Sequence, residues 1–179
     1  MKTRGILIFG ANGSGKTTLA RALAQALGFF FMDIETYHFA ESAIPYTAER
    51  PPEERLARML ADIGRHGDFV LSAVTGDFGG GIQDMYALAV YLSAPLGLRL
   101  ARVRERALAQ HGARVLPGGD MHAQQDSFND FVAARPLQRI EHYAEALTCP
   151  VIYLAGERAV DVNVAAVVTR FDALETRLK

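Results

Sequence analysis

The sequence predicts an α/β domain of three layers, in which helices cover both faces of a five-stranded parallel sheet. Two observations carry this prediction. Five short apolar runs alternate along the chain with segments whose apolar residues recur at helical spacing. A glycine-rich turn joins the first run to the first helix, and sheets of this kind hold ligands at the carboxyl ends of their strands. With 179 residues, the chain has the size of about one domain.

The predicted strands are almost continuously apolar, as expected for parallel strands that are buried on both faces. Loop formers or polar residues follow them, so the residues at the strand ends are the first candidates for chemistry. The strands are expected over residues 5–9, 29–32, 69–74, 88–92 and 151–154.

Helices are predicted between the strands. In the first one, leucines recur every four residues up to Gly28, a residue type that is common at helix ends. Residues 36–52 contain three prolines and are expected to be irregular. The helical stretch 122–147 is expected to be interrupted near Pro136, because proline disrupts a helix interior. The other helices are expected over 53–65, 96–110 and 161–178.

Composition excludes several classes of protein. The 19 basic and 20 acidic residues leave a net charge of -1, and 50% of the residues are hydrophobic, which disfavours a disordered chain and a general polyanion-binding surface. No apolar run approaches the ~20 residues that cross a bilayer. The single cysteine, Cys149, has no internal disulfide partner and is expected to fill space in the interior. We expect a cytoplasmic monomer or homodimer that binds neither membranes nor nucleic acid.

Residues 10–17 read GANGSGKT and match the pattern G-x-x-x-x-G-K-[ST] between a predicted strand and a predicted helix. Its glycines let backbone amides approach phosphate oxygens, and the start of the following helix adds a positive end. The ammonium of Lys16 can follow the β- and γ-phosphates, and the Thr17 hydroxyl can bind the Mg²⁺ that bridges them. The motif therefore predicts ATP, or another nucleoside triphosphate, with Mg²⁺. The expected nucleotide-binding residues are Gly10, Ala11, Asn12, Gly13, Ser14, Gly15, Lys16, Thr17 and Thr18.

This motif and the order of elements resemble the small P-loop kinases, a group that includes shikimate, gluconate and adenylate kinases. The resemblance covers most of the chain in element order and includes one highly specific motif. It implies a P-loop NTPase fold with strand order 2-3-1-4-5 and a single domain over residues 1–179. It also implies that residues 36–67 cover the phosphoryl acceptor and that residues 111–121 form a lid loop.

Two acidic residues follow the second predicted strand. Asp33 and Glu35 are two positions apart, so in an extended chain both carboxylates point the same way. Shikimate kinases carry an Asp-x-Asp pair here, in which the first acid contacts the water shell of Mg²⁺ and the second holds the acceptor hydroxyl. The resemblance implies that Asp33 and Thr17 serve the metal, and that Glu35, in place of the second Asp, serves the acceptor as a general base. A solvated strand end is the alternative for both acids.

Arginines are concentrated after the fourth predicted strand, where the resemblance implies a lid. Arg114 is the predicted lid arginine, because a guanidinium over the phosphates stabilises the charge that spreads over them during transfer. The resemblance further implies that Arg102 or Arg106 packs on adenine and that the loop with Arg158 cups the base. A solvated helix face is the alternative for Arg102 and Arg106.

The acceptor side resembles no specific site. Residues 36–55 offer aromatic and basic groups, of which Arg50 and Arg55 could clamp a monophosphate and Tyr46 is a further recognition group. Asp77 is a displaced acid after the third strand that serves the metal, the substrate or only the turn. The expected substrate-binding residues are Glu35, Tyr37, His38, Arg50, Arg55, Gly76 and Asp77.

We therefore expect an ATP- and Mg²⁺-dependent phosphotransferase that acts on a hydroxyl or phosphate of a small metabolite. The alternative is a nucleotide-binding regulatory P-loop ATPase that has no small-molecule acceptor and engages a macromolecule through residues 36–55. A dinucleotide-dependent oxidoreductase is disfavoured, because the glycine-rich turn does not read G-x-G-x-x-G. The expected catalytic residues are Lys16, Asp33, Glu35 and Arg114.

Overall fold

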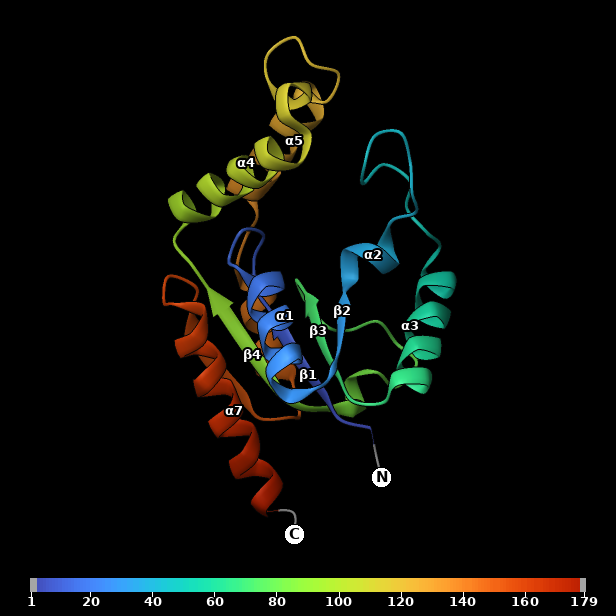
Figure 1. Cartoon of the computed structure of the whole chain (residues 1–179), viewed down its shortest axis with the longest axis vertical. Coiled ribbons are helices and arrows are strands. Elements are labelled where there is room, and N and C mark those ends of the chain that lie inside the picture. The colour runs from blue at the N-terminus through green and yellow to red at the C-terminus, as the bar shows by residue number, and fades with distance from the viewer. Residues whose placement is uncertain (1–2, 178–179) are drawn as a thin grey trace.

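The structure is a computed structural model and describes residues 3–177. Its centre is a five-stranded sheet with the strand order β2-β3-β1-β4-β5, in which every neighbouring pair is parallel (Figure 1). The predicted class and the predicted strand order are therefore confirmed. The strands are β1 (Gly5–Phe9), β2 (Phe30–Asp33), β3 (Phe69–Ala73), β4 (Tyr86–Ser93) and β5 (Val151–Ala155).

Helices cover both faces of the sheet and make the three layers (Figure 1). On one face, α1 (Lys16–Leu27) and α7 (Val160–Arg177) pack on the even-numbered residues of β1, Ile6 and Ile8. Both of these isoleucines are fully buried. Because successive side chains of a strand point to opposite faces, the odd-numbered residues of β1 are left for the other core.

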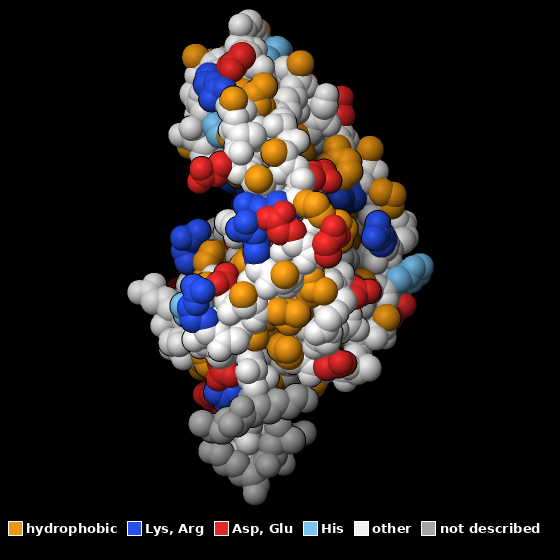
Figure 2. Space-filling model, turned by 90° about the vertical axis from the view of Figure 1, so that its right-hand side faces the viewer, with side chains coloured by type: hydrophobic (Ala, Val, Ile, Leu, Met, Phe, Trp, Pro, Cys, Tyr) orange, Lys and Arg blue, Asp and Glu red, His pale blue; other side chains and the backbone are white. Residues whose placement is uncertain are grey.

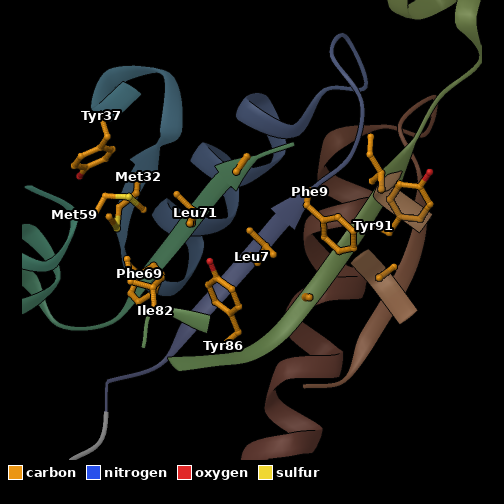
Figure 3. Packing of buried hydrophobic residues seen from close by; sticks show 14 of the residues in the cluster. Leu7, Phe9, Met32, Tyr37, Met59, Phe69, Leu71, Ile82, Tyr86 and Tyr91 are labelled. Atoms are coloured by element: carbon orange, nitrogen blue, oxygen red, sulfur yellow. The ribbon is translucent and has the colours of Figure 1, made fainter. Parts of the chain in front are cut away.

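That second core is shown in Figure 3, where Leu7 and Phe9 of β1 lie beside side chains of the neighbouring strands. It is covered by α3 (Pro52–His66) and α6 (Gln138–Ala146). The Phe9 ring stacks on Tyr91 of β4 with a centroid separation of 5.3 Å. With both faces covered, β1 is buried over its whole length, so the loop that follows it starts from a rigid base.

The connection after β2 differs from the expectation. Residues 34–38, part of which was expected to be irregular, form the short helix α2 (Ile34–His38). Asp33 caps it, because its carboxylate accepts a hydrogen bond of 3.2 Å from the backbone N–H of Glu35. The chain then turns and returns as an isolated antiparallel bridge between Phe39 and Glu49.

The chain after β4 forms a lobe at the carboxyl end of the sheet (Figure 1). It consists of α4 (Leu96–His111), the 3-10 turn η2 (Gly112–Val115), which lies in the expected lid loop, and α5 (His122–Ala134). The expected break near Pro136 is confirmed, since α5 ends at Ala134 and α6 begins at Gln138. A further 3-10 turn, η1 (Gln83–Met85), precedes β4.

Two remaining expectations concern burial. Cys149 is half-buried against the second core, and burial raises the pKa of its thiol. Between residues 3 and 177, no helix combines the length and the apolar character that a membrane span requires. The cytoplasmic location and the oligomeric state stay predictions.

Candidate active site

A cavity of about 610 Å³ lies at the carboxyl ends of the strands. All five strands contribute to its wall, either directly or through the loops that follow them. Figure 2 shows basic and acidic side chains gathered side by side at the waist of the molecule, below the lobe. The predicted residues that line the cavity are Asn12, Gly13, Ser14, Gly15, Lys16, Thr17, Thr18, Asp33, Glu35, Arg102, Arg106 and Arg158.

The glycine-rich loop adopts backbone conformations that other residues rarely reach. Gly13 and Gly15 have φ angles of 79° and 100°. A Cβ atom on Gly13 would lie 2.3 Å from the carbonyl oxygen of Arg99, so the loop packs directly on the first turn of α4. Gly10 and Ala11 belong to the same turn but lie outside the cavity wall.

Lys16 lies at the start of α1 with its ammonium turned back over the loop. Its Nζ atom donates a hydrogen bond of 2.9 Å to the carbonyl oxygen of Ala11. Burial lowers the pKa of Lys16 to about 8, against the opposing effect of Glu35. Burial disfavours the charged form, which an anion in the cavity would stabilise.

Asp33 and Glu35 both line the cavity, but not for the expected reason. Asp33 is the last residue of β2, but Glu35 is not on the strand, because the chain enters α2 directly after Asp33. Burial raises the pKa of Glu35, and nearby Arg106 opposes the shift. Lys16, Asp33 and Glu35 are close enough for each acid to raise the pKa of the lysine.

Two hydroxyl groups and one carboxylate lie at the phosphate end of the cavity. The Oγ1 atom of Thr17 is 3.2 Å from the Oγ atom of Ser72, and Ser72 pairs in register with Asp33. These oxygen ligands fit Mg²⁺, which keeps its remaining positions for water and phosphate oxygens. Over residues 3–177, no cluster of three or more His, Cys, Asp or Glu residues offers a metal site made by the protein alone.

The opposite end of the cavity is formed by α4 and the loop between β5 and α7. Arg102 donates hydrogen bonds to the carbonyl oxygens of Ser14, at 3.3 Å, and Gly156, at 2.9 Å. It thereby ties this loop to the phosphate-binding turn. Arg106 instead affects the pKa of Lys16 and of Glu35, which places it toward the phosphate end.

Arg114, the predicted lid arginine, is exposed and lies outside the cavity wall. Its guanidinium forms an ion pair of 2.8 Å with Asp120. Arg114 also donates a hydrogen bond of 3.5 Å to the carbonyl oxygen of Ala43, and Gln124 of α5 donates one of 3.1 Å to that of Pro45. The role of Arg114 over the phosphates stays a prediction.

Most of the predicted acceptor residues have partners inside the protein. The Tyr37 hydroxyl donates to Asp62 at 2.8 Å, and Arg50 donates to backbone carbonyls at the end of α2, among them that of Thr36 at 2.9 Å. Arg55 donates to Nδ1 of His38 at 2.6 Å. None of these four predicted residues lines the cavity.

The loop after β3 is also separate from the cavity. Gly76 is buried, and its carbonyl oxygen accepts a hydrogen bond of 2.8 Å from the Tyr86 hydroxyl. Asp77 is exposed and does not line the cavity. Of the aromatic groups expected at the acceptor, Tyr46 is the one that reaches the cavity wall.

Sequence reasoning missed several residues of this site. Ser72 was visible as the polar residue within an apolar strand, and Asn163 as a polar residue on the apolar stripe of α7. Arg135, which lowers the pKa of Lys16, gave no signal, because only folding brings α5 toward the phosphate-binding turn. Arg21 and Gln110 also line the cavity.

Several known proteins are similar to this chain. Residues 6–71 match the family described as "ATPase family associated with various cellular activities (AAA)". A Bacillus subtilis relative, "Uncharacterized protein YqaC", is 28% identical over 90% of this chain and 93% of its own length. The shikimate kinase of Ruegeria pomeroyi is 29% identical over 95% of this chain and 88% of its own length.

The solved shikimate kinase from Bacteroides thetaiotaomicron has the same fold. It superposes with a TM-score of 0.57 over 95% of this chain and 99% of its own, at 20% identity. The fold and the glycine-rich turn define the class, a P-loop protein. Within that class, the proteins to which the chain is similar include shikimate kinases.

Proposed function

We propose that the protein transfers the γ-phosphoryl group of ATP to a hydroxyl or phosphate oxygen of a small metabolite. One observation carries the proposal: a single cavity joins the phosphate-binding turn at Lys16 to the half-buried acid Glu35. The first is suited to hold a triphosphate, and the second to take a proton from an acceptor beside it.

Catalysis in this proposal rests on positioning and on charge. The acceptor oxygen forms a bond to the γ-phosphorus while the bond to the bridging oxygen of ADP breaks, and Glu35 accepts the proton of an acceptor hydroxyl. The raised pKa of Glu35 makes it a stronger base. Lys16 and Arg106 stabilise the negative charge of the transferring group.

Mg²⁺ would be held by Thr17 and, directly or through water, by Asp33, with Ser72 beside them. When bound, it would neutralise phosphate charge. The nucleotide base would stack on the flat face of the Arg102 guanidinium, because the edge of this group is held by hydrogen bonds to two backbone carbonyls.

The proposal is tested by a transfer screen with γ-labelled ATP and Mg²⁺ over nucleosides, nucleotides, sugars and antibiotics. We expect transfer to at least one acceptor class. We also expect Lys16→Ala to lower kcat/KM by at least ~10²-fold, the loss that follows removal of a charged transition-state contact. Arg58→Ala is the matched control, since Arg58 is exposed on α3 and does not line the cavity.

Equal transfer by the wild type and Lys16→Ala would refute the assignment. ATP hydrolysis that ignores every metabolite, but changes severalfold with a protein partner, would favour the regulatory ATPase instead.

A further inference from the structure

Asn163 lies in the cavity wall at the end away from Lys16 and is 3% exposed. It occupies the first turn of α7, on the stripe that continues with Val167 and Phe171, both buried in the core. An apolar side chain would satisfy packing on this stripe. A buried amide here therefore needs a polar partner.

Only the NH2 group of the Asn163 amide has a hydrogen-bond partner. The Nδ2 atom of Asn163 donates a hydrogen bond of 3.0 Å to the carbonyl oxygen of Ala155, at the end of β5. Because a carbonyl oxygen can only accept, this contact fixes which way the amide is turned. The Oδ1 atom is left buried and without a partner among the described residues.

None of the described residues donates a hydrogen bond to Oδ1. The backbone N–H of Asn163 is bonded to Ala159, and Arg102 is committed to the carbonyls of Ser14 and Gly156. Arg158 and Val160, which line the same wall, are exposed, so their side chains can move aside for a ligand. A ligand that fills this end of the cavity can supply the missing donor.

Resting on the proposed function, we propose that Asn163 selects adenine by accepting a hydrogen bond from its 6-amino group. The triphosphate lies at residues 13–18, so the nucleoside extends toward α4 and α7, where Arg102 offers its flat face. At position 6 adenine presents N–H donors, whereas guanine presents an oxygen that Oδ1 would repel. A site built to bond one polar group rejects the analogue that lacks it.

The test is the affinity of the full chain for three triphosphates with Mg²⁺, measured by isothermal titration calorimetry. ATP carries the 6-amino group, purine riboside triphosphate lacks it, and GTP replaces it with oxygen. We expect ATP to bind the wild type about tenfold more tightly than either analogue, as for one hydrogen bond to a buried acceptor. In Asn163→Leu, we expect ATP and purine riboside triphosphate to bind within about twofold of each other.

Asn129→Leu is the matched control, because it makes the same change on α5, away from the cavity wall. It should keep the wild-type preference for ATP. Wild-type affinities for ATP and purine riboside triphosphate within about twofold would overturn the assignment of Asn163, and would leave the phosphotransferase proposal standing. Binding of none of the three triphosphates would overturn both. The wild-type comparison alone decides the matter if Asn163→Leu does not fold.

Discussion

Replacing Gly13 by alanine tests how the phosphate-binding turn is built. The new Cβ would lie 2.3 Å from the carbonyl oxygen and 2.8 Å from the Cα of Arg99. Both are backbone atoms of α4, so no flexible side chain can yield. Either the turn or the helix has to shift, and Arg102, three residues further along α4, shifts with it.

Two contributions set the size of the effect. Alanine at a φ of 79° costs about 1–2 kcal/mol, the usual difference for a side chain in the left-handed region. The clash with α4 adds about 1–3 kcal/mol, as for overpacking elsewhere. We therefore expect Gly13→Ala to lower the free energy of unfolding by about 2–5 kcal/mol.

The chain provides controls that separate these contributions. Gly28 has a φ of 67° but no atom within 4 Å of an added Cβ, so Gly28→Ala should lower the free energy of unfolding by the conformational contribution alone. Gly64, within α3, has free space and an ordinary helical φ, so Gly64→Ala should raise stability by up to about 1 kcal/mol. Urea unfolding measures all three variants. A Gly13→Ala loss no larger than that of Gly28→Ala would refute the close packing of turn and helix.

Two further predictions concern the charged groups of the cavity. Since the pKa of Lys16 is lowered to about 8, its ammonium is present at pH 7 and largely lost at pH 9. Affinity for ATP should fall about tenfold over that range in the wild type and stay constant in Lys16→Ala. The same pH dependence of affinity in both proteins would contradict the role of Lys16. Arg102→Ala releases the carbonyls of Ser14 and Gly156 and should weaken ATP binding about tenfold in calorimetry. The same change at exposed Arg104 should leave it unaltered, and equal effects would contradict the proposed role of Arg102.

The fold and the phosphate end of the site follow from local sequence. Each strand is a short apolar run, and the motif in residues 10–17 sets its own backbone through glycines and through the helix that follows. Neither feature depends on distant residues, so both can be predicted from the chain itself. The sequence did not predict α2. Asp33 caps this helix by accepting a hydrogen bond from the backbone N–H of Glu35, but in the sequence the two acids look like alternate residues of a strand.

The acceptor end depends on contacts that sequence does not display. Tyr37 looked like a recognition group, but folding brings Asp62 to its hydroxyl. Arg50 looked like a phosphate clamp, and it donates to carbonyls at the end of α2. The sequence shows which polar groups a loop carries, but it does not show which residues they contact. The roles of such residues therefore become clear only when the fold is known.

A long-range contact also joins residues 36–67 to the lobe after β4. Ile44 packs against Val115 and Met121 of the lobe, and its carbonyl oxygen accepts hydrogen bonds of 2.6 Å from both Ser42 and Thr47. Tyr46, two residues on, lines the cavity. The lobe and the cavity wall are therefore connected through the turn around Ile44. Residues 36–67 and the lobe therefore meet beside the cavity through a contact that the local sequence does not display.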